Sequence, residues 1–281
     1  MQRTDLAVEV IEGEKNLKGV RMKKRGRVYD VTEIEVETDD LREVIGKSRG
    51  RYVTLECGHL SRFSDDYEEM VRELSAELSE FIPEGDALVV GLGNSDITPD
   101  ALGPLTASKV LATRHLREEL SENGENFLTS LRRVSVFSGG VLGQTGIETA
   151  ELVGAICRKA EPSVIIAVDA LACSDISRLG TTIQISDSGI SPGSGVANAR
   201  KELSPKLFGI PVIAVGVPTV ADMYTIVRSF TNTEPNENLP NMIVTPRDID
   251  RLIERSAQLI AFAVNMALHP TLTFEDVRSL F

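Results

Sequence analysis

Two aspartates in this chain follow apolar stretches that have the composition of buried strands. Asp100 comes after Ala87–Val90 and a glycine-rich turn, and Asp169 directly follows Val164–Val168. A carboxyl group at the end of a buried strand costs free energy unless it is paired or hydrogen-bonded, so both positions suggest function. If the two strands are neighbours, the carboxyl groups can share one proton, one acting as base toward water and the other as acid toward a leaving group. This pattern predicts a hydrolase of the aspartic type.

Simpler roles exist for both aspartates. Asp100 lies just before a helix that Pro104 can open, so it could serve as a helix cap. Asp169 could bond the amides of a local turn. Both residues could instead ligate zinc or nickel if a histidine joined them. The chain has three histidines, none of which follows a predicted strand: His59, His115 and His269. We expect all three at the surface or at helix ends, and no metal in the site.

A loop rich in glycine and serine spans Ser186–Val196. Four of its residues are candidates for binding a substrate oxyanion through backbone amides, namely Gly189, Gly193, Ser194 and Gly195. Glycine allows backbone amides to approach a ligand closely, although a plain turn is the simpler interpretation. The chain has no GxSxG motif and no histidine with an evident route to these serines, so we do not expect a serine nucleophile.

The order of the predicted elements must bring these residues together. Five short apolar runs are predicted as strands: Ala87–Val90, Val134–Phe137, Val164–Val168, Thr181–Ile185 and Pro211–Val215. Four stretches are predicted as helices between and after them: Pro104–Leu116, Gly146–Lys159, Val220–Phe230 and Arg247–Leu268. This alternation predicts an α/β fold with a mostly parallel sheet flanked by helices. Sites in such folds lie at the carboxyl edge of the sheet, where Asp100 and Asp169 are expected.

The first part of the chain has a different pattern. Gly26–Val36 and Arg51–Glu56 alternate apolar and polar residues with period two, which predicts half-buried, antiparallel strands. A helix is predicted from Ser64 to Phe81. We therefore expect a single α/β domain over residues 1–281, with residues 1–63 as a β-rich elaboration within it.

Composition excludes several classes of protein. The chain has 30 basic and 42 acidic residues, a net charge of −12, which argues against direct binding of nucleic acid or of an anionic membrane. No apolar run approaches the roughly 20 residues that cross a bilayer, and no signal peptide is evident. Three cysteines without a CxxC pair favour a reducing, cytoplasmic compartment. The turn after Val90 lacks the third glycine of a dinucleotide-binding motif, so no cofactor is expected.

A series of short segments, taken together, resembles the germination protease family, the spore proteases of endospore-forming bacteria. These segments occur in order along nearly the whole chain: Arg3–Ala7, Gly91–Asn94, Thr98–Pro104, Gln144–Thr149, Val168–Ala172, Thr182–Ile185, Gly189–Val196, Gly216–Val220 and Ala267–Pro270. The resemblance implies an endopeptidase that initiates the degradation of small acid-soluble spore proteins during germination, in the cytoplasm of the spore core. It also implies a homo-oligomer, a tetramer in the family.

The resemblance also assigns residues. The family is similar in core fold to hydrogenase-maturation proteases, in which two acids and a histidine hold a metal. In germination proteases the two acids remain and the histidine does not, so by position Asp100 and Asp169 are the catalytic acids. A metal-dependent peptidase of the hydrogenase-maturation type, using the same acids, is the alternative, and a non-enzymatic binder of spore proteins is a third hypothesis.

Two further expectations follow from the resemblance. The family cuts after an acidic residue and before a hydrophobic residue followed by alanine, so a basic group is expected in the cleft, with Arg178, Arg200 and Lys201 as candidates. Family members are zymogens with an N-terminal propeptide, and Arg3–Ala7 resembles the start of the mature enzyme. We expect either that this chain needs little or no trimming or that it lacks the propeptide.

Overall fold

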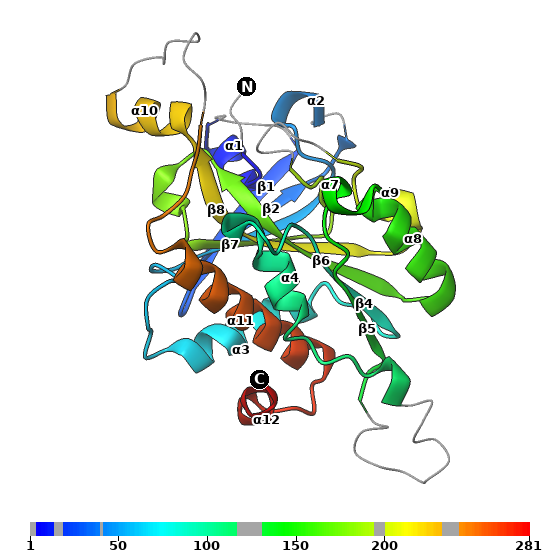
Figure 1. Ribbon diagram of the computed structural model, residues 1–281. Coiled ribbons are helices and arrows are strands. Elements are labelled where there is room, and N and C mark those ends of the chain that lie inside the picture. Colours follow the sequence, from blue (N-terminus) through cyan, green and yellow to red (C-terminus); the bar gives the residue numbers. More distant parts are fainter. Residues whose placement is uncertain (1–3, 14–18, 40–41, 117–130, 194–199, 232–241) are drawn as a thin grey trace.

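One mixed β-sheet runs through the molecule (Figure 1). The computed structural model describes residues 4–13, 19–39, 42–116, 131–193, 200–231 and 242–281. In these residues, nine strands pair in the order β1-β2-β3-β7-β8-β6-β4-β5, and β9 pairs with the end of β8. The strands are β1 Val20–Gly26, β2 Asp30–Val36, β3 Gly50–Glu56, β4 Ala87–Gly91, β5 Val134–Phe137, β6 Val164–Cys173, β7 Thr182–Ser186, β8 Val212–Asp222 and β9 Ile243–Val244.

The helices are distributed along the whole described chain. They are α1 Ala7–Gly13, α2 Arg42–Ile45, α3 Tyr67–Ser79, α4 Leu102–Ala107, α7 Leu142–Thr145, α8 Thr149–Ala160, α9 Pro205–Phe208, α10 Met223–Thr231, α11 Ile249–Leu268 and α12 Phe274–Leu280. Two short 3₁₀ turns are η2 Thr98–Asp100 and η3 Ile176–Arg178. Among the described residues, no helix combines the length and the apolar character needed to cross a membrane.

The predicted α/β class is confirmed, and the sheet divides into two halves by strand direction. β5, β4, β6 and β8 are parallel, whereas β1, β2, β3 and β7 pair antiparallel. The expectation of a mostly parallel sheet therefore holds only for the half that carries the two aspartates. The predicted strand Thr181–Ile185 corresponds to β7, which runs antiparallel to both β3 and β8 and joins the two halves.

The parallel half is covered by helices on both faces, as its continuous apolar runs predict. Alternate residues of β4 and β6 belong to different cores: Val89 and Ile166 pack with α3, α4 and α11, whereas Leu88 and Ile165 pack with α8. Figure 1 shows α3, α4 and α11 lying together across one side of the sheet. A third core holds α1 against β2 and β3, with Leu6 fully buried.

The antiparallel half confirms the predicted β-rich N-terminal part. Period-two alternation correctly predicted β2 and β3. The two strands pair antiparallel, with Val31 opposite Leu55. β1 was not predicted, because six of its seven residues are exposed and four are charged, so no buried apolar face marks it. It is held by its ladder to β2 and by ion pairs from Arg25 to Glu33 and Glu77.

Two predicted helices differ from the structure for identifiable reasons. The expected helix Pro104–Leu116 ends at Ala107, because Asn265 of α11 takes over the next backbone groups: its Nδ2 donates to the Lys109 carbonyl at 2.8 Å and its Oδ1 accepts from the Leu111 amide at 2.8 Å. The expected helix Val220–Phe230 starts only at Met223, since β8 continues through Asp222.

We expect Asn265→Ala to destabilise the fold by about 1–3 kcal/mol, because it removes the partner of two partly buried backbone groups. Asn265 is only 1% exposed, so water cannot replace the lost bonds. Urea unfolding followed by circular dichroism measures the change. Glu254→Ala, an exposed position on the same helix, is the control and should stay within about 0.5 kcal/mol of the parent. Equal stability of the two variants would contradict this role of Asn265.

Candidate active site

Asp169 lies in the interior of the sheet, just beyond the end of β4. The sequence predicted that Asp169 follows the strand. In the structure β6 continues to Cys173, so Asp169 lies inside it. Its neighbour Val168 is the last β6 residue with a β4 partner, Gly91, while on the other side Asp169 pairs with Gly216 of β8. The side chain is therefore placed where one neighbouring strand has ended, which is the carboxyl-edge position expected for a site.

Asp100 ends the 3₁₀ turn η2, which follows the glycine-rich turn after β4. Its Oδ2 accepts a hydrogen bond of 2.8 Å from the Asn94 amide, so the carboxyl group is folded back onto the turn that precedes it. The hydroxyl of Thr219 on β8 donates to the Pro99 carbonyl at 2.8 Å. These contacts fix the turn between the ends of β4 and β8.

Glycines permit this close approach. A Cβ on Gly103 would lie 2.2 Å from the Leu92 carbonyl oxygen and 2.4 Å from the Val168 carbonyl oxygen. Gly93 has a φ of 109°, and a Cβ there would lie 2.1 Å from the Asp100 carbonyl oxygen. Any larger residue would push the start of α4 away from the sheet, and with it Asp100 away from Asp169.

Both carboxyl groups line one cavity of about 480 Å³. Most of its surface is apolar, with contributions from Ile97, Val141, Leu142, Val220 and Ile243. Arg200 and Lys201 also line the cavity. A mostly apolar cavity in which a few acidic and basic groups converge has the usual character of a ligand-binding or active site.

The two carboxyl groups differ in proton affinity. Burial raises the pKa of Asp169 well above its ordinary value, and the negative charges of Asp100 and Asp5 raise it further, against one hydrogen bond of 2.9 Å from the Ala170 amide. Burial also raises the pKa of Asp100, which the Asn94 amide partly offsets. Asp169 is therefore the last to ionise. Such a pair can present a carboxylate and a carboxylic acid in one site.

Asp5 is a third acid at the cavity and was not identified as a site residue from the sequence. Its amide donates to the Ala172 carbonyl at 3.0 Å, and its Oδ2 accepts from the Ala172 amide at 2.9 Å. The N-terminal segment thus pairs with the part of β6 that follows Asp169. The only signal in the sequence was that Asp5 belongs to the Arg3–Ala7 segment, and nothing in that segment's composition indicates which strand it meets.

The predicted loop residues are only partly brought to the site. Gly193 lines the cavity. Gly189 lines a neighbouring pocket instead, and its φ of 87° lets it lie against the Leu203 carbonyl, where a Cβ would be 2.2 Å away. Ser194 and Gly195 lie outside the described residues.

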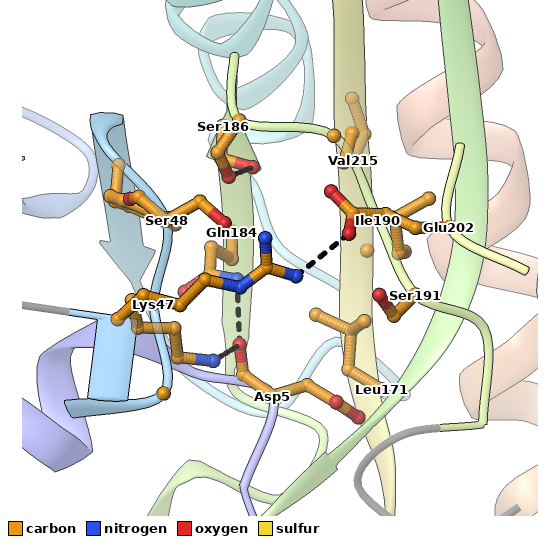
Figure 2. A pocket seen from close by; sticks show the side chains of 17 residues that line it. Asp5, Lys47, Ser48, Leu171, Gln184, Ser186, Ile190, Ser191, Glu202 and Val215 are labelled. Carbon is orange, nitrogen blue, oxygen red and sulfur yellow. Dashed lines mark hydrogen bonds and ion pairs between the residues drawn. The ribbon is translucent and has the colours of Figure 1, made fainter. Parts of the chain in front are cut away.

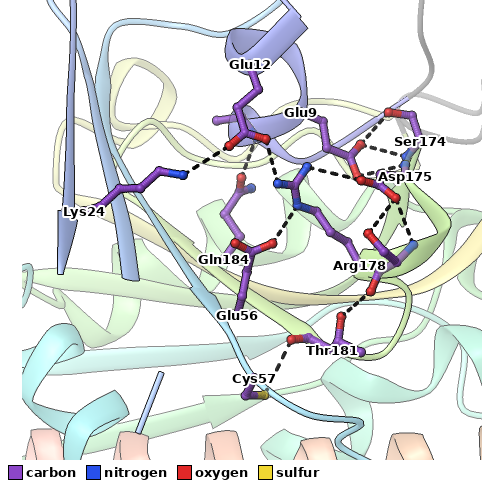
Figure 3. Close-up of polar contacts among 12 residues, drawn as sticks. Glu9, Glu12, Lys24, Glu56, Cys57, Ser174, Asp175, Arg178, Thr181 and Gln184 are labelled. Carbon is purple, nitrogen blue, oxygen red and sulfur yellow. Dashed lines mark hydrogen bonds and ion pairs between the residues drawn. The ribbon is translucent and has the colours of Figure 1, made fainter. Parts of the chain in front are cut away.

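The three basic candidates have different surroundings. Arg178 is not among the residues that line the cavity, and its guanidinium is held by carboxylates, at 2.8 Å from Glu12, 2.9 Å from Glu56 and 3.9 Å from Asp175 (Figure 3). Its ion pairs join α1, β3 and η3, and the structure does not bring this candidate for substrate binding to the cavity.

Arg200 and Lys201 both line the cavity but differ in their ion-pair partners. Lys201 is paired with Glu151 at 2.6 Å. Within the described part of the chain, the guanidinium of Arg200 has no hydrogen-bond or ion-pair partner. Arg200 is therefore the better placed of the two to bind an acidic group that enters the cavity.

The histidines do not complete a metal site in the described residues, where no three His, Cys, Asp or Glu side chains are grouped so that they could hold an ion. His269 ends α11, as predicted, but it is buried and not at the surface, and burial lowers its pKa to about 4. His59 lines a separate pocket formed with Phe63 and Arg255. The donors at the cavity are carboxylates without an imidazole, which does not match the acid–histidine set of the metal alternative.

Known proteins resemble this chain over its whole length. The sequence profile of "Germination protease" matches residues 2–232. The germination protease of Clostridium tetani is 38% identical, covering 99% of this chain and 98% of its own. That of Caldanaerobacter subterraneus subsp. tengcongensis is 37% identical, with coverages of 99% and 97%. That of Priestia megaterium is 36% identical, with coverages of 95% and 93%.

One similar solved structure is the [NiFe] hydrogenase maturation protease HycI from Thermococcus kodakarensis KOD1. It shares 17% sequence identity at a TM-score of 0.35, covering 67% of this chain and 98% of its own. The assignment rests on the sequence matches, which cover nearly the full length of both partners. By these matches the chain belongs to the germination protease family, peptidases that act in spore germination.

Proposed function

We propose that this protein is an endopeptidase that initiates the degradation of small acid-soluble spore proteins during germination, with Asp100 and Asp169 activating the attacking water. The observation that carries this proposal is the joint placement of two carboxyl groups of unequal proton affinity in one peptide-sized cavity. Family membership supplies the peptidase activity and the setting in germination. No step of the proposed mechanism needs a cofactor.

The difference in pKa between Asp100 and Asp169 assigns the roles of base and acid. The Asp100 carboxylate removes a proton from a water molecule as the water oxygen bonds to the carbonyl carbon of the scissile peptide bond. The Asp169 carboxyl group gives its proton to the leaving nitrogen as the carbon–nitrogen bond breaks. A proton then passes from Asp100 to Asp169, which restores the starting state and leaves a carboxylic acid and an amine as products.

Recognition of an acidic substrate residue is assigned to Arg200. Its guanidinium lies at the wall of the same cavity and is not committed to a carboxylate of the described chain. The apolar side chains around the cavity suit the hydrophobic residue that would follow the cleavage point. The net charge of −12 favours direct contact with the spore proteins and not with DNA. A cytoplasmic location in the spore core and assembly as a homotetramer belong to this proposal.

The segment around Asp5 supports regulation as a zymogen. It lies against the cavity and is hydrogen-bonded to β6 through both the backbone and the side chain of Asp5. A substrate that takes the same course must displace this segment. The chain would therefore be less active while this segment keeps its place than when the segment has moved aside.

Asp100→Asn and Asp169→Asn should each lower kcat on a peptide with Glu before Leu-Ala by about 100-fold or more, because each removes a proton-transfer group. Cleavage is measured by chromatography of the fragments, and circular dichroism checks that the fold is retained. Asp96→Asn changes an exposed acid of the same turn and should leave the rate unaltered. Near-normal cleavage by either variant would refute the pair. Inhibition of the wild type by a chelator would favour the metal-dependent alternative.

The pH profile of kcat/KM should be bell-shaped, since the proposed mechanism requires ionised Asp100 and protonated Asp169. The rate rises as pH increases through the pKa of Asp100 and falls as pH increases through the pKa of Asp169. Both limbs should lie above the ordinary aspartate value of about 3.9, because burial raises both pKa values. A profile without an alkaline limb would contradict the role of Asp169 as an acid.

The same pKa shift predicts an effect on stability. The folded-state pKa of Asp169 is raised, so its contribution to stability is fully present below the unfolded pKa and is lost as pH rises through the folded pKa. Asp169→Asn should therefore melt at a higher temperature than the wild type at alkaline pH and at a similar temperature at acidic pH. Thermal unfolding at both pH values measures this, and a stabilisation independent of pH would argue against a protonated Asp169.

Arg200→Gln should raise KM about tenfold for the peptide with Glu before the cleavage point and should change KM much less for the matched peptide with Gln there. The reason is that a charge-assisted hydrogen bond to the substrate carboxylate is lost. Steady-state kinetics on the two peptides give the ratio. Lys206→Gln removes an exposed cation of α9 outside the cavity and serves as control. An equal loss on both peptides would exclude Arg200 as the specificity residue.

A further inference from the structure

A small polar pocket of about 110 Å³ adjoins the catalytic cavity, and Asp5 and Leu171 line both. Figure 2 shows Lys47 and Gln184 reaching toward Asp5 from two sides of this pocket. The pocket is formed by the segment after α2, by β7 and by the start of the Gly189 loop. Asp5 thus lies between the cavity that contains the proposed catalytic acids and this smaller polar pocket.

The peptide carbonyl of Asp5 receives two side-chain donors. Lys47 Nζ lies 2.7 Å from the Asp5 carbonyl oxygen, and Gln184 Nε2 donates to the same oxygen at 3.0 Å. Lys47 Nζ also contacts the Thr4 carbonyl oxygen at 3.4 Å. Gln184 Oε1 accepts from the Ala7 amide at 2.7 Å, which holds the Gln184 amide group in one orientation. Lys47 and Gln184 therefore converge on one peptide oxygen.

Burying the Lys47 ammonium group costs more free energy than is needed only to anchor the Thr4–Asp5 segment. Burial lowers the pKa of Lys47, and the negative charges of Asp5 and Glu9 only partly offset this. Both of its contacts go to neutral peptide oxygens, whereas Arg42 in the same pocket pairs with a carboxylate, Glu202, at 2.9 Å. A cation aimed at a neutral carbonyl gains most when negative charge develops on that oxygen.

We propose that Lys47 and Gln184 form the oxyanion-binding pair of the peptidase, donating to the carbonyl oxygen of the peptide bond that is hydrolysed. The inference rests on the proposed function, and it takes the course of Thr4 and Asp5 as the course of a bound substrate. When water adds to the carbonyl carbon, the carbonyl electron pair moves to the oxygen, where the two donors stabilise it. The pair returns to form the product carbonyl as the carbon–nitrogen bond breaks.

This pair takes the role that the sequence suggested for backbone amides of the glycine–serine loop. Of the loop residues named for it, Gly193 lines the catalytic cavity, but Gly189 lies against Leu203. Lys47 is far in sequence from Gln184 and from the loop, whereas Gln184 lies in β7 just before the loop, so no local motif indicated the pair. Their convergence depends on the pairing of β3 with β7, which places Gln184 opposite Thr54.

Lys47→Met tests the proposal, because methionine has a similar length and no donor. On the peptide with Glu before Leu-Ala, kcat should fall about 100-fold, as for loss of an oxyanion donor, with little change in KM. Lys47→Arg keeps a donor and should recover part of the rate. Arg42→Gln is the matched control, since it lines the same pocket without touching the Asp5 carbonyl, and it should cleave like the wild type.

A binding measurement separates catalysis from anchoring. A peptide phosphinate, which mimics the tetrahedral intermediate, should lose affinity for the Lys47→Met variant in proportion to the fall in kcat/KM. Binding of the unmodified peptide is compared in two proteins that cannot cleave it, the Asp100→Asn variant and the double variant Asp100→Asn, Lys47→Met. The two should bind the peptide with equal affinity. Equal losses for phosphinate and peptide, or an unchanged kcat, would overturn the proposal.

A second variant covers failure of the first to fold. Gln184→Met removes the other donor and should lower kcat about tenfold or more, with the same selective loss of phosphinate affinity; if that affinity is retained, the proposal is overturned. Peptide cleavage by the wild-type protein distinguishes failure of this inference from failure of the proposed function on which it rests. If the wild type does not cleave the peptide, the proposed function fails; if it does and both variants cleave normally, only the oxyanion pair fails.

Discussion

The site depends on the burial of one carboxyl group, that of Asp169, inside β6, a strand whose other residues are all apolar. Only 4% of this residue is exposed, and one backbone amide is the hydrogen-bond donor to its side chain among the described residues. Such burial disfavours the ionised form, and the nearby charge of Asp100 disfavours it further. The fold thus places an acid of strongly raised pKa next to an acid that ionises earlier. The proposed acid–base mechanism depends on that difference in pKa and uses one kind of side chain for both roles.

Close backbone packing maintains this arrangement. β4 ends at Gly91, one residue before the level of Asp169, and the chain must turn and return at once for Asp100 to reach the same place. Gly93 and Gly103 make that return possible, since a Cβ at either would overlap backbone oxygens. Backbone atoms relax less readily than side chains, so the separation of the two acids is set by the sheet itself. A site built in this way tolerates varied apolar walls while the acids stay fixed.

The sequence was informative where a signal is local. Asp100 and Asp169 were located because apolar runs of strand length precede them, and α8, α11 and the β2–β3 ladder followed from periodicity. Non-local pairing explains the rest. Arg178 and Arg200 look alike in sequence, and they differ because Glu12 and Glu56, distant along the chain, neutralise the first. The same holds for the early end of α4, which Asn265 dictates, and for Asp5, whose partner Ala172 is 167 residues away. Resemblance to a family could name a candidate catalytic pair, but it could not supply these contacts.

The N-terminal segment connects the site to the rest of the fold, and its anchoring limits which part of it can move. Glu9 accepts hydrogen bonds from the amide and hydroxyl of Ser174 and from the Asp175 amide, just after β6, and Arg178 binds Glu12 (Figure 3). Leu6 packs in a buried core with α1. Withdrawal of α1 would therefore expose apolar surface, remove Glu9 from its hydrogen-bond partners and break the ion pair of Arg178 with Glu12. Thr4 and Asp5, in contrast, are held mainly by hydrogen bonds that a bound peptide could replace. Exchange between this segment and a substrate can thus be confined to the residues at and before Asp5, with β6 and Asp169 left in place.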